Sequence, residues 1–141
     1  VPSIFALIKE LAEFEKLSDQ INTSEDELRK TLFGENKFVE ILLAEYDNKV
    51  VGQALFFKNF STFLGKSGIY LEDLYVKPEM RGKGIGKALL DKIISIAKER
   101  NYGSGEWSVL NWNEPAIEFY KKISAKPLDE WTIFRLTSDK F

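Results

Sequence analysis

A glycine-rich turn between a predicted strand and a predicted helix restricts the fold of this chain more than any other feature. The turn, Arg81 to Lys87, follows a β-branched and aromatic run, Tyr70 to Val76, and a Lys77-Pro78-Glu79 corner, and it precedes a strongly amphipathic helix. Glycines allow positive φ and close approach of the backbone to a ligand, and a helix N-terminus supplies unpaired N–H groups and partial positive charge. The pattern therefore predicts a strand, turn and helix that bind an anion such as a pyrophosphate.

The spacing of the glycines excludes two phosphate-binding motifs. A Walker loop needs four residues between its glycine and a Gly-Lys pair, and then Ser or Thr, whereas Gly82 and Gly86 enclose three residues and Ala88 follows Lys87. A dinucleotide fingerprint needs its third glycine three residues after the second, whereas Gly82, Gly84 and Gly86 alternate. The turn is therefore another kind of anion-binding loop or a purely structural turn.

Composition points to one soluble globular domain. Hydrophobic residues make up 44% of the 141 residues and charged residues 30%, with both signs interspersed. No apolar run is long enough to span a bilayer, and a net charge of −2 argues against a general nucleic-acid partner. Local cations suit one compact polyanion, such as coenzyme A; they are Arg81, Lys83, Lys87, Lys121 and Lys122.

The chain contains no Cys and no His. This excludes a thiolate nucleophile, a Ser-His dyad, a disulfide and the usual zinc ligands. Acid–base chemistry must therefore use Glu, Asp, Tyr, Lys or water, and we expect no metal. The lack of Cys fits a reducing cytoplasm. The chain starts at Val1 without a signal-like segment, so we expect that upstream residues have been removed or left out.

Residue patterns predict an α+β layout with a mixed central sheet that carries helices. Apolar periodicity predicts a helix over residues 4–17, and Thr23 or Ser24 caps a second helix that Gly34 ends. Further helices are expected over residues 86–100 and 115–123. The expected strands are 38–46, 50–58, 69–76, 106–110 and 131–136, with turns at 47–49 and 65–68.

Several segments together resemble one enzyme group. They are Leu7 to Glu15, Tyr70 to Asp73, Arg81 to Gly86, and Trp112 to Pro115 ahead of Phe119-Tyr120. The chain resembles the diamine acetyltransferases of the GNAT superfamily of N-acetyltransferases, the spermidine/spermine and thialysine group. The resemblance implies a single N-acetyltransferase domain over residues 1–141, acetyl-CoA as co-substrate, a small primary-amine substrate and a homodimer. A GNAT domain normally begins with a strand before its first helix, and we expect that this strand is truncated.

The resemblance also implies which residues hold acetyl-CoA. Main-chain groups of Leu74, Tyr75 and Val76 would contact the pantetheine arm, and Asn113 and Ala116, at the start of a helix, would touch the same cofactor. The residues expected around the pyrophosphate are Arg81, Gly82, Lys83, Gly84, Ile85, Gly86 and Lys87.

Two residues are expected to carry the chemistry. Tyr120, with an ordinary pKa near 10, would protonate the departing thiolate, and Glu72 would receive the proton of the amine, through water. Strand alternation predicts that Glu72 shares one face with Tyr70, Leu74 and Val76, opposite Asp73, unless a bulge interrupts the strand and frees backbone N–H groups. The resemblance implies substrate contacts from Phe14, Glu15, Glu72, Asp73, Glu106, Trp107 and Ser108.

Other interpretations of the same residues stay open. Ser61 and Phe63 stand where polyamine-specific members have an acidic residue and a Trp, which favours the thialysine branch over a long polycation. The acceptor could instead be a protein N-terminus, a peptide or an antibiotic, or the chain could be a non-catalytic acyl-CoA-binding module. Glu72 could be a solvated strand residue and Tyr120 a core aromatic. No nucleic acid or membrane partner is expected.

Overall fold

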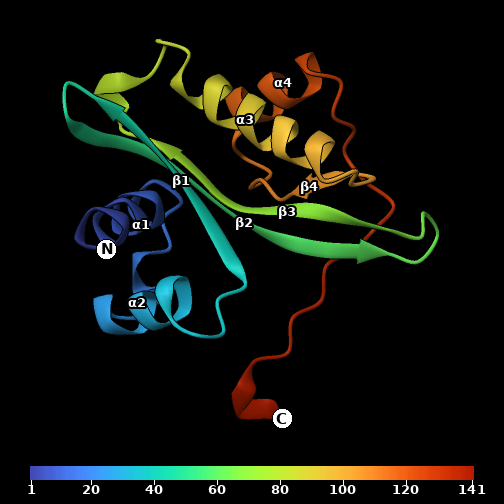
Figure 1. Cartoon of the computed structure of the whole chain (residues 1–141), viewed down its shortest axis with the longest axis horizontal. Helices are drawn as coiled ribbons and strands as arrows, with labels where there is room; N and C mark the ends of the chain where they lie inside the picture. Colours follow the sequence, from blue (N-terminus) through green and yellow to red (C-terminus); the bar gives the residue numbers. More distant parts are fainter. The chain divides into compact units, whose positions relative to one another are not determined.

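The computed structural model describes all 141 residues as two compact units, Val1–Ser108 and Val109–Phe141 (Figure 1). The strands of the first unit are β1 (Val39–Tyr46), β2 (Lys49–Ser61), β3 (Lys66–Val76) and β4 (Gly105–Trp107). Its helices are α1 (Pro2–Phe14), η1 (Ser18–Gln20), α2 (Glu25–Phe33), η2 (Pro78–Met80) and α3 (Ile85–Glu99). The second unit holds α4 (Glu114–Lys122) and η3 (Ser138–Lys140). None of these helices combines the length and apolar character needed to cross a bilayer.

The four strands form one mixed sheet in the order β1-β2-β3-β4. The β1–β2 and β2–β3 pairs are antiparallel, and the β3–β4 pair is parallel. Asp47 and Asn48, with φ of 51° and 63°, make the two-residue turn between β1 and β2, as a right-twisted hairpin requires. The predicted α+β class with a mixed sheet is confirmed, and Lys49 belongs to β2 rather than to the turn.

The second hairpin turn lies earlier than predicted. β3 already begins at Lys66, so of the expected turn 65–68 only Gly65, with φ of 63°, lies outside the strand. Gly68 lies inside β3, next to the turn that leads to β4. A Cβ added to it would lie 2.8 Å from the Ser104 carbonyl oxygen. This glycine permits close backbone approach rather than a turn.

A β-bulge divides β3. Leu55 pairs with Asp73 and Phe56 pairs with Leu71, so Glu72 is an extra residue without a partner on β2. The bulge resets the alternation of side chains, because residues that pair across the sheet share a face. Asp73 therefore shares a face with Tyr70 and Tyr75, and Leu74 and Val76 lie on the opposite face with Leu71. The prediction that Tyr70, Leu74 and Val76 share one face, opposite Asp73, was wrong for this reason.

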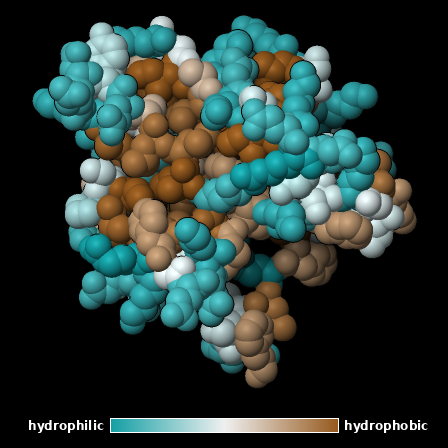
Figure 2. Space-filling model, viewed as in Figure 1, coloured by the Kyte–Doolittle hydropathy of each residue, from teal (hydrophilic) through white to brown (hydrophobic).

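Helices cover both faces of the sheet in the first unit (Figure 1). On the face of Leu55, Ile4 of α1 and Leu32 of α2 complete a buried cluster. On the other face, α3 buries Leu89, Leu90 and Ile93. Figure 2 shows apolar side chains gathered over the part of the first unit where Figure 1 places α1. The two layers of helices hold β3 from both sides.

Helix α1 ends at Phe14, three residues before the predicted end. Lys16 has φ of 61°, its N–H donates to Glu13, and the Leu17 N–H donates to Ala12 at 2.8 Å. These bonds form a Schellman motif, which usually has glycine at the left-handed position. Because Lys16 occupies that position, the sequence carries no stop signal there. The early stop makes Glu15 the C-cap residue of α1.

The other helix ends agree with the sequence to within one residue, except that α1 begins at Pro2, two residues before its predicted start. The Ser24 side chain caps α2 by accepting from the Glu27 N–H at 3.3 Å, and Gly34 ends this helix, as predicted. Helix α3 starts and ends one residue earlier than expected, as does α4. Polar caps and apolar periodicity depend only on neighbouring residues, so they predict helix ends without knowledge of the tertiary structure.

Two predicted strands differ from the structure. β4 spans residues 105–107 and so overlaps the expected strand 106–110 at only two residues, because its pairing with β3 stops at Leu71 and Trp107, just before the bulge. Residues 131–136 form no strand. Their pattern has β propensity, but a strand exists only where a neighbouring strand pairs with it. Trp131 and Phe134 in this segment are 74% and 90% exposed.

Candidate active site

The second half of β3 offers an edge without a strand partner. From Glu72 onward β3 pairs with β2 but not with β4. The Lys77 N–H donates to the Val51 carbonyl on β2, so the alternation of main-chain groups directs those of Val76 and Leu74 away from β2. Leu74 and Val76 are two of the three residues expected to contact a pantetheine arm, whereas the main-chain groups of the third, Tyr75, face β2 by the same alternation. The Val76 carbonyl accepts from Arg81 Nε at 3.0 Å.

Three carboxylates come together beside the bulge. Burial, together with the nearby carboxylates of Glu72 and Glu15, raises the pKa of Asp73 to about 6. Burial also raises the pKa of Glu15, the C-cap of α1. Glu15 and Asp73 are partly buried and Glu72 is exposed. Such a group of negative charges favours a cation, whose charge would lower the raised pKa values of Glu15 and Asp73 again. The structure thus brings together Glu15, Glu72 and Asp73, to which the family resemblance assigned substrate contacts, and those contacts stay predictions.

A small cavity lies beside these carboxylates. Its volume is about 180 Å³, and it is bounded by α1, the segment after α1, and β3. Glu15 and Asp73 provide its acidic side chains. The remaining lining is mostly aliphatic and comprises Ile8, Leu11, Ala12, Leu17, Gln20 and Ile21. Apolar walls with carboxylates at one side suit an alkyl chain that ends in an ammonium group.

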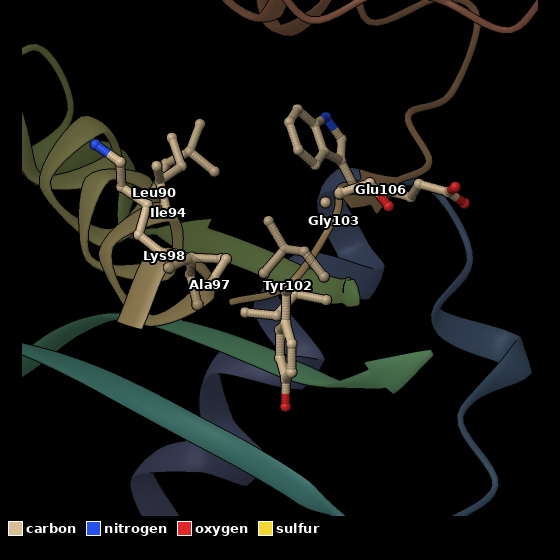
Figure 3. A pocket seen from close by; sticks show the side chains of 13 residues that line it. Leu90, Ile94, Ala97, Lys98, Tyr102, Gly103 and Glu106 are labelled. Atoms are coloured by element: carbon tan, nitrogen blue, oxygen red, sulfur yellow. The ribbon is translucent and has the colours of Figure 1, made fainter. Parts of the chain in front are cut away.

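A second cavity of the first unit, about 200 Å³, lies on the opposite face of the sheet (Figure 3). It is lined by Ile69 and Leu71 of β3, by α3, and by Trp107 of β4. In Figure 3 the Glu106 carboxylate points away from the labelled α3 side chains. The structure therefore separates Trp107 from the carboxylate group around Asp73, and the substrate roles of Glu106 and Trp107 stay predictions.

Ser108 contacts the sheet through a tyrosine that the sequence did not suggest as a site residue. The hydroxyl groups of Ser108 and Tyr70 lie 2.9 Å apart, and the Tyr70 ring lies 5.3 Å from the Phe57 ring. Tyr70 shares the face of Asp73 because of the bulge. Only the bulge reveals this shared face, since simple alternation places Tyr70 opposite Asp73.

The glycine turn has the geometry of an anion-binding loop. Gly82 and Gly84 have φ of 79° and 82°, and Gly84 is the N-cap of α3. An added Cβ at either glycine would meet no atom within 4 Å, so the space beside this backbone is open. Gly86 lies inside the helix, and the first turn of α3 carries no acidic side chain. The residues present therefore fit a pyrophosphate at the helix N-terminus.

The cations of this loop make contacts within the protein. Lys87 pairs with Asp91 at 2.8 Å, and the Lys83 ammonium lies 5.1 Å from the centre of the Tyr46 ring. Both are exposed contacts and therefore weak, so an incoming phosphate can displace them. The Arg81 guanidinium instead lies over the Phe14 and Tyr75 rings.

In the second unit, Tyr120 lies on α4 and its ring centre is 5.6 Å from that of Phe119. The Asn113 side chain caps this helix by accepting from the Ala116 N–H at 3.4 Å. Ser124, with φ of 72°, ends the helix in a second Schellman motif. Asn113 and Ala116 thus have a structural role in α4. Their cofactor contacts and the proton donation by Tyr120 stay predictions.

Comparison with known proteins agrees with the fold and the glycine loop. The sequence profile of the Acetyltransferase (GNAT) family matches residues 5–124. The thialysine N-epsilon-acetyltransferase of Sus scrofa is 40% identical over 97% of this chain and 86% of its own length. The L-ornithine N5-acetyltransferase of Arabidopsis thaliana is 31% identical over 99% of this chain and 81% of its own length. An integron cassette protein from the mobile metagenome of V. cholerae has 26% identity and superimposes with a TM-score of 0.81, over 98% of this chain and 86% of that one.

The mixed sheet, the glycine loop at a helix N-terminus and these matches define an acyl-transferring enzyme. The chain belongs to the Acetyltransferase (GNAT) family, whose members use acetyl-CoA as co-substrate. The predicted fold and the predicted enzyme class are both confirmed.

Proposed function

We propose that this enzyme transfers an acetyl group from acetyl-CoA to the primary amine of a small aminoalkyl substrate, such as a diamine, a polyamine, thialysine or a lysine analogue. The observation that carries the proposal is the group of carboxylates, Glu15, Glu72 and Asp73, beside an aliphatic cavity of about 180 Å³. An alkylammonium ion matches both parts, since its charge pairs with carboxylates and its methylenes pack on aliphatic walls.

The reaction requires a neutral amine. An alkylammonium ion with a pKa near 10.4 must give up its proton, which costs about 4–5 kcal/mol at pH 7. Glu72 suits this step because the bulge exposes its side chain at the end of the doubly paired part of β3. It would take the proton through a water molecule. Ionised Asp73 and Glu15 would hold the remaining positive charge of a diamine.

Acetyl transfer then proceeds by direct attack. The amine nitrogen bonds to the thioester carbonyl carbon, the carbon–sulfur bond breaks, and the thiolate leaves with the bonding electrons. Tyr120 would give this thiolate a proton and regain one, through water, from the nitrogen that becomes positively charged on attack, so that the products are an acetamide and free coenzyme A. Main-chain groups of Leu74 and Val76 would hold the pantetheine arm, and residues 81–87 would hold the pyrophosphate.

The relatives support a small amine acceptor. Two of them are named for the acetylation of thialysine and of L-ornithine, and both match almost the whole of this chain. Ser61 and Phe63, which lie at the end of β2 and in the following turn, favour the thialysine type of acceptor over a long polycation.

We also propose that residues 1–141 act as one N-acetyltransferase domain, because the family match crosses the boundary between the two compact units. The resemblance to diamine acetyltransferases supports a homodimer, and a net charge of −2 without Cys supports a cytoplasmic protein that binds no nucleic acid. A monomeric mass in light scattering would contradict the dimer.

The test is a thiol-release assay with acetyl-CoA against thialysine, lysine, ornithine, putrescine, spermidine, an aminoglycoside and a short peptide. We expect turnover with the aminoalkyl compounds and little with the peptide or the aminoglycoside. Preference for the peptide or the aminoglycoside would overturn the proposed acceptor class. Coenzyme A binding in calorimetry without acetylation of any amine would instead favour a non-catalytic acyl-CoA-binding protein.

A further inference from the structure

The Arg81 side chain does not extend along the glycine loop that it begins. Its guanidinium carbon lies 5.0 Å from the centre of the Phe14 ring and 5.4 Å from the centre of the Tyr75 ring. Its Nε donates to the Val76 carbonyl at 3.0 Å. Arginine suits this place because its planar group stacks on rings while an N–H in the same plane donates a hydrogen bond. The side chain therefore ties the loop to the end of α1 and to β3.

The ring partners of Arg81 belong to the acceptor side of the site. Phe14 is the last residue of α1, and the next residue, Glu15, lines the carboxylate cavity with Asp73. The Schellman motif at Lys16 fixes the backbone of this turn. The Phe14 ring and the Glu15 carboxylate therefore project from the same hydrogen-bonded turn.

A second set of contacts holds α1 against the same end of β3. The Tyr75 hydroxyl donates to Glu10 at 3.4 Å, and Glu10 pairs with Lys77 at 3.6 Å. Glu10 lies one helical turn before Phe14, so two successive turns of α1 contact the strand end that leads into the glycine loop. Arg81 sits between the loop and this contact.

We propose that Arg81 is a positioning residue that couples the two substrate sites: through Phe14 it links the acetyl-CoA loop to the end of α1 that carries Glu15. Binding of coenzyme A at the loop then orders the acceptor cavity, and an amine in the cavity strengthens coenzyme A binding to the same extent, since such coupling is reciprocal. The proposal rests on the proposed function for its acceptor site, and its first test does not depend on any acceptor.

The first test is a double-mutant cycle on coenzyme A affinity, measured by calorimetry with Arg81→Lys, Phe14→Leu and the double variant. Lysine keeps the charge but loses the planar fork. We expect each single change to weaken coenzyme A binding about two- to tenfold, the range of a cation–π contact. The double variant should bind coenzyme A as tightly as the single variant with the lower affinity, because the two changes remove the same contact. If Phe14→Leu leaves the affinity unchanged, Arg81 acts on coenzyme A without α1 and the proposal is wrong.

A matched control separates this contact from general damage to α1. The Lys9 ammonium lies 4.3 Å from the centre of the Phe5 ring near the other end of the same helix. Phe5→Leu therefore removes a similar contact from α1, and we expect it to leave coenzyme A affinity unchanged. Equal losses in Phe5→Leu and Phe14→Leu would overturn the proposal, and thermal melts identify any variant that is not folded.

The second test measures the coupling itself. With saturating coenzyme A, we expect wild-type affinity for the best amine of the assay panel to rise about fivefold or more, and the rise to shrink towards none in Arg81→Lys. An unchanged ratio in Arg81→Lys would overturn the coupling. If no amine binds at all, the proposed acceptor class fails while the cycle on coenzyme A still decides the role of Arg81.

Discussion

The two halves of β3 serve different purposes although they belong to one strand. From Lys66 to Leu71 the strand pairs with β2, and its last three residues there, Ile69 to Leu71, also pair with β4. The apolar side chains of Ile69 and Leu71 are 2% and 3% exposed. From Glu72 to Val76 the strand keeps only β2 as a partner and carries the carboxylates. A strand paired on both sides contributes stability, and a strand paired on one side leaves main-chain groups for a ligand. The bulge at Glu72 marks the change.

The largest effect is expected in the half of β3 that pairs only with β2. Glu72→Gln removes the proposed proton acceptor while keeping the shape of the side chain, so we expect kcat/KM for the preferred amine to fall about 10²- to 10⁴-fold. Because Glu72 is exposed, the unfolding midpoint should stay close to that of the wild type. Steady-state kinetics and urea unfolding measure the two effects. Glu35→Gln, at another exposed glutamate, is the control. If Glu72→Gln lowers kcat/KM less than threefold, Glu72 does not have the assigned role.

A second substitution tests the half of β3 that reaches both β2 and β4. Leu71→Ala should lower the free energy of unfolding by about 2–5 kcal/mol, because it leaves a cavity in the packed face beneath α3. Turnover per folded molecule should remain near the wild-type value. Urea denaturation gives the stability, and Leu43→Ala, at a 42% exposed position on β1, should cost much less. Equal costs at the two leucines would show that β3 is not the more strongly held strand.

The smallest effect concerns Asp73, which adjoins the bulge. Its pKa is about 6 in the folded chain against an ordinary 3.8, so between these pH values the folded state binds more protons than the unfolded state. The free energy of unfolding should therefore fall as the pH rises from about 4 to 6, and the ionised carboxylate destabilises the fold at higher pH.

Asp73→Asn removes this charge. We expect the variant to be more stable than the wild type at pH 8, by up to about 3 kcal/mol, and to lose this advantage near pH 4. Urea unfolding at the two pH values measures the difference, with the exposed Asp129→Asn as the control. A gain that is the same at both pH values would mean that ionisation of Asp73 is not its cause.

Local signals in the sequence predicted much of this structure. The glycine loop, the Ser24 cap and the apolar periodicities depend on neighbouring residues, and they predicted the helices to within a residue or a few. The approach of Glu15 to Glu72 and Asp73 was inferred through the family resemblance, since nothing local joins residues so far apart in the chain.

Features that depend on the pairing of distant segments were not predictable. The bulge position follows from how β2 and β3 align, and it moved Tyr70 and Asp73 to the same face. The segment 131–136 has the composition of a strand but forms none, because β propensity describes a surface that must still find a partner. The left-handed Lys16 gave no signal because its side chain is not a usual helix stop.

The helix ends at Lys16 and Ser124 leave room for engineering. Both residues hold a left-handed conformation that costs an L-amino acid about 1–2 kcal/mol and costs glycine almost nothing. The enzyme therefore carries two positions at which thermostability can be raised without touching a packed core, and each follows a segment with a proposed role in the reaction. Thermal melts of Lys16→Gly and Ser124→Gly would show how far each substitution raises the unfolding midpoint. A protein engineer would start with these two turns rather than with the interior.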